Sequence, residues 1–215
     1  GSITFIAACG AWFFVTQMAI GKRVRGPFPL STFVILIVTS AITLLQFIDH
    51  DVLTSLERHT GDLSSGRYWK LFTPLFVQSD GWGDAITNTI AYLIVAFVAE
   101  RVYGRRRVLL MYFIPGIVGD AFGFAWTDHG AANSVAIAGL IGGFLMLELV
   151  HEHRLPRIAP ILAIVGLLGA VTLCLLSEIH GPAILTGAVL GYALNHVSPM
   201  LPHHAAPPVT AAATT

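Results

Sequence analysis

Seven long runs of apolar residues constrain this chain more than any other feature of its sequence. The runs cover residues 3–20, 30–48, 82–99, 108–126, 134–150, 158–176 and 180–195. A helix that crosses a bilayer needs about 20 mostly apolar residues, and each run reaches or approaches that length. Only 11% of the residues are charged, whereas soluble domains carry roughly 25%. We therefore expect an all-α integral membrane protein, because so few charges cannot cover a globule in water.

Basic residues alternate between the connections and predict the orientation, because Lys and Arg in short loops favour the cytoplasmic side. The connections after the first, third and fifth runs hold nine of the twelve basic residues: Lys22, Arg23, Arg25, Arg101, Arg105, Arg106, Arg107, Arg154 and Arg157. This pattern places the N-terminus and the long loop at residues 49–81 outside, and the C-terminus in the cytoplasm. The tail at residues 198–215 is rich in Pro, Ala and Thr, and we expect it to be disordered.

Three polar residues within the apolar runs fall at similar depths. At 1.5 Å per helical residue, Ser134, His180 and Asn88 lie about 24, 22 and 18 Å above the inner ends of their runs. All three depths belong to the outer half of a hydrocarbon core of about 30 Å. Polar groups are costly there and are candidates for function. A serine and a histidine at one depth could form a nucleophile–base pair, with the asparagine amide available to an oxyanion.

Each of these residues also has a structural interpretation. A serine at a helix start commonly caps the helix, a histidine at a membrane boundary can be interfacial, and an asparagine can bond to a neighbouring helix. Small residues four apart add a packing argument, since they let helices approach closely. Such pairs are Gly139 with Gly143 and Gly187 with Gly191. If these two faces meet, the serine and the histidine come together.

Four elements between residues 66 and 194 together resemble the rhomboid intramembrane serine proteases. Residues 66–76 (GRYWKLFTPLF) are similar to the outer-loop signature of the family, usually G-x-W-W-R followed by T-P-x-F. Asn88, with an E-R pair and a glycine behind it, is similar to the N…E-R/K…G pattern. Residues 132–142 (ANSVAIAGLIG) resemble G-x-S-G-x-x-x-G-L-x-G, which presents the nucleophile. Residues 180–187 (HGPAILTG) resemble H-x-x-G-x-x-x-G, which carries the base.

This resemblance implies a rhomboid-like core of six transmembrane helices at residues 30–197. Residues 3–29 would then form one extra N-terminal transmembrane helix with a basic cytoplasmic loop. It also implies a multi-pass protein of the plasma membrane, or of the inner membrane if bacterial, with its site near the outer leaflet. Substrates would be transmembrane segments of membrane proteins in the lipid bilayer. The sequence does not indicate an oligomeric state.

The resemblance further implies residue roles. Ser134 and His180 would form a catalytic dyad without a third, acidic member. Asn88 and the backbone N–H of Val135 would make the oxyanion site. Positions that would support the site or contact substrate are Asn133, Ala138, Asp84, Trp69 and Lys70. The implied chemistry uses no metal and no cofactor.

The sequence departs from the family pattern at positions that the family uses around its active site. Ala132 and Val135 replace the glycines around the serine, and Val135 adds bulk beside the nucleophile. Ala138 stands where an aromatic ring usually packs against the histidine. Asp84 occupies the position of a histidine, and Lys70 replaces an arginine. These changes keep open a second interpretation, a catalytically inactive rhomboid-like protein that binds transmembrane clients.

A more distant interpretation is a transporter or proton-relay protein that uses Asp120, Glu178 and His180. No internal repeat supports it, and the sequence shows no evident basic partner for Asp120 in a facing helix. A metal site built on His203 and His204 would be an incomplete ligand set. The net charge is zero, so we expect no nucleic acid partner.

Overall fold

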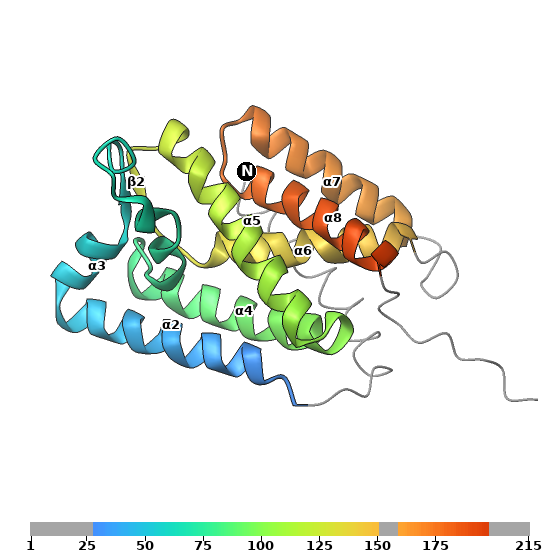
Figure 1. Ribbon diagram of the computed structural model, residues 1–215, viewed down its shortest axis with the longest axis horizontal. Coiled ribbons are helices and arrows are strands. Elements are labelled where there is room, and N and C mark those ends of the chain that lie inside the picture. The colour runs from blue at the N-terminus through green and yellow to red at the C-terminus, as the bar shows by residue number, and fades with distance from the viewer. Residues whose placement is uncertain (1–27, 151–158, 198–215) are drawn as a thin grey trace, which may run out of the picture.

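A computed structural model of the chain describes residues 28–150 and 159–197 (Figure 1). These residues form seven α-helices: α2 (Leu30–Ile48), α3 (His50–Leu56), α4 (Gly81–Tyr103), α5 (Arg105–Trp126), α6 (Ser134–Val150), α7 (Ala159–Leu175) and α8 (His180–Val197). The 3₁₀ helices η1 (Tyr68–Leu71) and η2 (Thr73–Phe76) and an antiparallel pair of short strands, β1 (Arg58–His59) and β2 (His129–Gly130), complete the described elements. In the bundle, α2 packs along α4 on one side, and α7 packs on α6 and α8 on the other.

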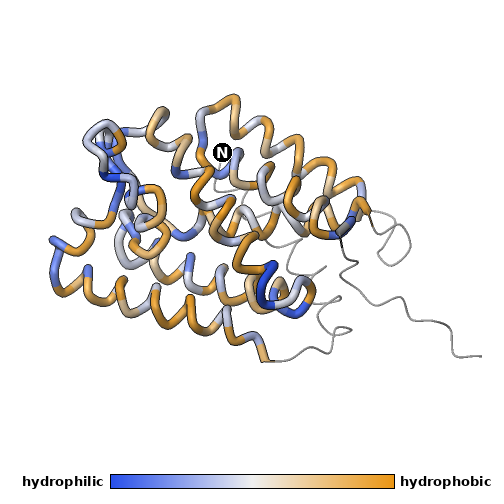
Figure 2. The backbone as a smooth tube through the Cα atoms, in the orientation of Figure 1, coloured by the Kyte–Doolittle hydropathy of each residue, from blue (hydrophilic) through white to orange (hydrophobic). Residues whose placement is uncertain are grey.

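Six of the seven apolar runs coincide with helices, and the run at residues 3–20 lies outside the described residues, as does the tail at 198–215. By length and composition, α2, α4 and α5 could each cross a membrane, and α6 and α7 are shorter apolar helices of 17 residues. Figure 2 shows hydrophobic residues along the helices and hydrophilic residues gathered near β1 and at the α4–α5 connection. The described residues are therefore mostly helical, with one short strand pair, as expected of a multi-pass membrane protein.

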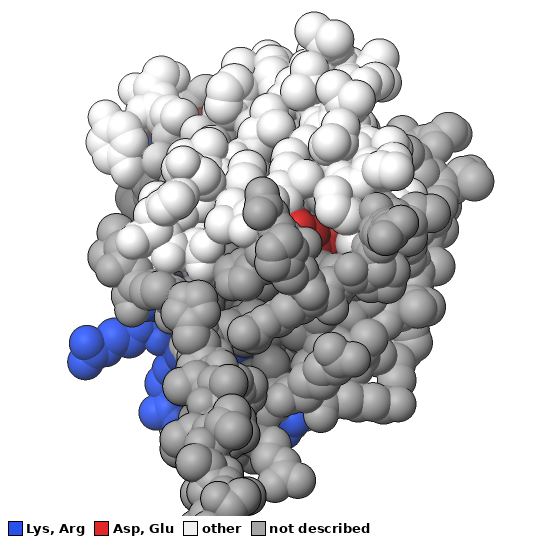
Figure 3. All heavy atoms as spheres, turned by 90° about the vertical axis from the view of Figure 1, so that its right-hand side faces the viewer, with Lys and Arg blue, Asp and Glu red and all other residues white. Residues whose placement is uncertain are grey.

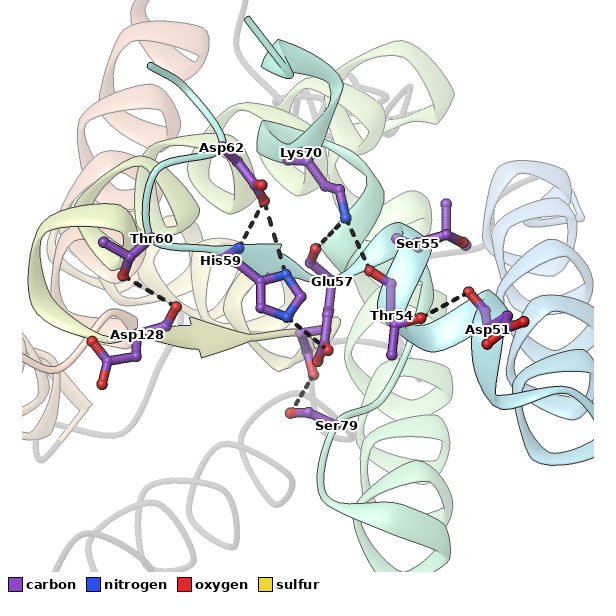
Figure 4. A network of polar contacts seen from close by, with 12 residues as sticks. Asp51, Thr54, Ser55, Glu57, His59, Thr60, Asp62, Lys70, Ser79 and Asp128 are labelled. Atoms are coloured by element: carbon purple, nitrogen blue, oxygen red, sulfur yellow. Dashed lines mark hydrogen bonds and ion pairs between the residues drawn. The ribbon is translucent and has the colours of Figure 1, made fainter. Parts of the chain in front are cut away.

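The segment at residues 49–81, which was expected to be an outer loop and is here called the outer segment, is folded (Figure 4). The Lys70 ammonium donates to the carbonyl oxygens of Glu57 at 2.6 Å and Thr54 at 3.2 Å, at the end of α3. Burial lowers the pKa of this ammonium. Asp62, which is fully buried, accepts from the His59 N–H at 2.8 Å and pairs with Arg67 at 2.9 Å. Internal polar contacts therefore hold this segment in one shape.

One buried ion pair ties the outer segment to α5. Arg58 Nε lies 3.1 Å from Asp120 Oδ1, and both side chains are 2% exposed. Arg58 also donates to Thr127 Oγ1 at 2.7 Å. The sequence showed no evident basic partner for Asp120 in a facing helix, and the partner that the structure provides comes from β1. A Cβ on Gly130 would lie 2.8 Å from the guanidinium of Arg58, so a larger residue at this position would displace the Arg58 side chain.

A second buried carboxylate fixes the start of α2. Glu100, in the last turns of α4, accepts hydrogen bonds from the N–H groups of Ser31 at 3.0 Å and Thr32 at 2.7 Å. It also accepts from the Thr32 hydroxyl at 2.8 Å. The first N–H groups of a helix have no partner within it, and a negative charge is favourable there. Glu100 therefore anchors α2 against α4.

Helices α6 and α8 approach each other closely through glycines. A Cβ on Gly187 would collide with the carbonyl oxygen of Gly139. A Cβ on Gly191 would lie 2.9 Å from the Cα of Gly143. The expected meeting of the two small-residue faces is confirmed, and it brings the starts of α6 and α8 together.

Substitution of Gly187 by Ala should destabilise the fold, because the atom that the new methyl group meets is backbone and cannot rotate away. Overpacking of this kind costs about 1–3 kcal/mol, which thermal unfolding in detergent would measure. The matched control is Gly83→Ala in α4, where a Cβ meets nothing within 4 Å. That change should be neutral or stabilising, since Ala favours helix more than Gly. Equal melting temperatures for both variants would contradict the close approach.

Candidate active site

Ser134 and His180 are the first residues of α6 and α8, and their side chains meet. Ser134 Oγ lies 3.0 Å from His180 Nε2. Both residues are partly buried. Ser134 is not the cap of its helix, because Ile137 N–H donates to the Asn133 carbonyl at 3.1 Å, which makes Asn133 the capping position. The hydroxyl is thus directed at an imidazole, the arrangement of a nucleophile and its base.

The other ring nitrogen of His180 lies against a carboxylate. His180 Nδ1 is 2.7 Å from Glu178 Oε1, and the Glu178 side chain is 38% exposed. The hydrogen bond with His180 lowers the pKa of the Glu178 carboxyl, and this effect outweighs the rise caused by burial. The resemblance implied a Ser134–His180 pair without an acidic member, so the contact between His180 and Glu178 differs from that expectation. The sequence signal was a carboxylate two residues before the histidine, which sequence reasoning assigned only to a proton relay.

Asn88 and Asn133 are joined through Gln78, a residue that sequence reasoning missed. Asn88 Nδ2 donates to Gln78 Oε1 at 2.8 Å, and Gln78 Nε2 donates to Asn133 Oδ1 at 3.0 Å. Gln46 of α2 fixes the Gln78 backbone, accepting from its N–H at 2.9 Å and donating to its carbonyl at 2.7 Å. An asparagine amide carries two N–H groups, so Asn88 retains one beyond its bond to Gln78. No sequence pattern links these amides, because they come from α2, α4 and two loops.

The Val135 side chain turns away from the serine and into the bundle. It is 1% exposed and packs with Ala138 and Ala183. A Cβ on Gly119 of α5 would collide with it. The Val135 N–H lies in the first turn of α6, where N–H groups have no carbonyl one turn earlier in the helix. The Val135 side chain, which was expected to crowd Ser134, is therefore accommodated between α5 and α8.

The remaining predicted residues have different surroundings. Asp84 lies one helical turn before Asn88, and its carboxylate interacts with the side-chain amide of Asn88. No aromatic ring in residues 28–150 and 159–197 stacks on His180 where Ala138 replaces the usual ring. Trp69 is 55% exposed, and Lys70 binds the carbonyls at the end of α3. No described contact joins these last two to Ser134 or His180.

A double-mutant cycle tests the placement of Val135. Gly119→Ala should lower the melting temperature, because its methyl group would strike the stiff Val135 side chain. Val135→Ala should also destabilise by leaving a void. The double variant should be more stable than the sum of the single effects predicts, with a coupling energy of about 0.5–3 kcal/mol. Strictly additive losses would mean that the two side chains do not touch.

Comparison of the sequence with known proteins identifies a family. A family model described as the rhomboid domain matches residues 65–198, which include Ser134, Glu178 and His180. The rhomboid protease GluP of Bacillus subtilis (strain 168) is 34% identical over 96 residues, covering 44% of this chain and only 19% of GluP. A second protein of that strain is YdcA, named as a rhomboid protease with the activity marked as unproven. It is 25% identical over 181 residues, covering 78% of this chain and 87% of YdcA.

The matched region is more than half of the chain. It contains the starts of α6 and α8, the helix α4 that carries Asn88, and the turn with Glu178. The chain belongs to the rhomboid family.

Proposed function

We propose that the protein is an intramembrane serine endopeptidase that cleaves transmembrane segments of membrane proteins. Ser134 is the nucleophile and His180 is the base. The observation that carries the proposal is the 3.0 Å contact between Ser134 Oγ and His180 Nε2 inside a rhomboid domain. The six helices α2 and α4–α8 form the membrane-spanning core.

The reaction follows from this pair. Ser134 Oγ attacks the carbonyl carbon of the scissile bond as its proton passes to His180 Nε2. The carbonyl oxygen becomes an oxyanion, which the second N–H of Asn88 and the N–H of Val135 stabilise. His180 then gives the proton to the departing amine nitrogen, and the acyl group remains on Ser134. Water repeats the attack with His180 as base, releasing the carboxylic acid and restoring the serine.

Two other interpretations are less well supported. An inactive client-binding protein was suggested by the altered glycines, but the Val135 side chain packs against α5 and α8 and leaves the serine accessible to its base. A proton relay through Asp120 requires a carboxylate free to exchange protons, whereas Asp120 is held by Arg58. The paired serine and histidine are explained better by covalent catalysis.

Labelling of the purified protein with a fluorophosphonate tests the nucleophile. Ser134 Oγ forms a bond to phosphorus, fluoride leaves with the bonding electron pair, and His180 takes the serine proton. The wild type should label. Ser134→Ala should abolish the signal, and His180→Ala should slow it by at least about 100-fold. The control is His196→Ala, which removes an exposed histidine at the other end of α8 and should label normally. A folded wild type that stays unlabelled would favour the inactive interpretation.

The orientation is proposed from the charges at the two ends of the bundle. Basic residues gather where α4 meets α5, because Arg105, Arg106 and Arg107 begin α5. Figure 3 views this end, where Lys and Arg side chains project from one edge of the described surface. Because cytoplasmic loops favour Lys and Arg, this end faces the cytoplasm, and the outer segment with Ser134 and His180 lies near the outer leaflet.

Thiol labelling of intact cells tests this orientation. Cys9 and Cys174 would first be replaced by Ala. Single cysteines would then be introduced as Ser65→Cys in the outer segment and as Arg106→Cys in the first turn of α5. Both positions are exposed. An impermeant maleimide should label the first and spare the second until the cells are lysed. The reverse pattern would invert the topology and move the site to the inner leaflet.

A further inference from the structure

The turn between α7 and α8 holds Glu178 in a fixed position. Ser177 has φ 56°, a left-handed conformation that non-glycine residues seldom adopt. The Ser177 N–H donates to the Cys174 carbonyl at 3.1 Å, and the Glu178 N–H donates to the Leu173 carbonyl at 2.9 Å. These two bonds form a Schellman motif. On the other side, the Glu178 carbonyl accepts from the Gly181 N–H at 3.0 Å, so the Glu178 backbone is bound to both helices.

From this turn the structure assigns Glu178 as a positioning residue for His180, an assignment that rests on the proposed protease function. Its carboxylate lies 2.7 Å from Nδ1, on the side of the ring opposite Ser134. The protein thus carries an acid–base–nucleophile row, Glu178–His180–Ser134, whose acidic member lies two residues before the base.

The carboxylate selects the useful tautomer of the imidazole. An ionised carboxylate only accepts hydrogen bonds, so Nδ1 must carry the proton that it donates to Glu178. In the neutral ring, Nε2 then has a lone pair, and this lone pair faces the Ser134 hydroxyl at 3.0 Å. With the opposite tautomer, Nε2 could not take the serine proton.

The same carboxylate stabilises the charge that forms during the reaction. When Nε2 takes the serine proton, the ring becomes an imidazolium with N–H groups on both sides. Hydrogen bonds between charged partners are about twice as strong as neutral ones, so the contact with Glu178 strengthens as the proton arrives. It also restrains the ring, since no aromatic side chain of the described residues stacks on His180.

A purely structural role is the competing explanation. Glu178 precedes the first turn of α8, where a negative charge is favourable to the helix dipole. Asp80 offers a matched control, because it occupies the equivalent end of α4 and its side chain makes no capping hydrogen bond. A general charge effect at a helix start would appear in both positions, whereas the hydrogen bond to His180 Nδ1 is made by Glu178.

The experiment measures fluorophosphonate labelling at a series of probe concentrations for the full-length wild type, Glu178→Gln, Glu178→Ala and Asp80→Asn. Loss of a charged hydrogen bond predicts that the limiting rate falls by about 10- to 100-fold in both Glu178 variants. The half-saturating probe concentration and the melting temperature should remain near the wild-type values. Asp80→Asn should label at the wild-type rate. Glu178→Gln preserves the size of the side chain and carries the test alone if Glu178→Ala does not fold.

The outcomes separate the two proposals. Wild-type labelling with an unchanged limiting rate in Glu178→Gln would overturn the role of Glu178 and leave the protease intact. An equal loss in Asp80→Asn and Glu178→Gln, or a loss that follows the melting temperature, would overturn it in favour of helix stabilisation. A wild type that does not label would overturn the protease function and this inference together.

Discussion

The contact of α6 with α8 is the constraint on which the candidate site depends. Gly187 of α8 lies so close to the α6 backbone that a methyl group at this position would strike the Gly139 carbonyl. Dispersion contacts of this kind are weak one by one and large in sum, and small residues maximise them between membrane helices. Because both helices begin at the same level, their first side chains, Ser134 and His180, come within 3.0 Å. The site is therefore a result of packing deep in the bundle.

The helices could be predicted from the sequence because burial in lipid requires long apolar runs. The runs at 30–48 and 134–150 match α2 and α6 at both ends. The glycine spacing indicated that Ser134 and His180 would come together if the two small-residue faces met. Contacts that depend on loop conformation could not be predicted. Arg58 reaches Asp120 across 62 residues, and Gln78 links amides from separate elements. No periodicity records which loop side chain folds back onto which helix.

Val135 and Glu178 show why single positions are hard to interpret from a motif. The sequence places Val135 next to Ser134, but in a helix adjacent residues point about 100° apart, and the Val135 side chain lies against α5 and α8. Glu178 stands outside the helix that begins with His180, and the left-handed turn at Ser177 directs it at the imidazole ring. In both cases side-chain direction, which depends on backbone conformation, decides the role.

The pairing of Arg58 with Asp120 also has a consequence for the order of assembly. An unpaired charge buried away from water is strongly unfavourable, so the charged forms of Asp120 and Arg58 are best accommodated together. Arg58 precedes Asp120 by 62 residues along the chain, and the pair can therefore form only after α5 has been synthesised. The segment that carries Arg58 gains this anchor from a helix that follows it in the sequence.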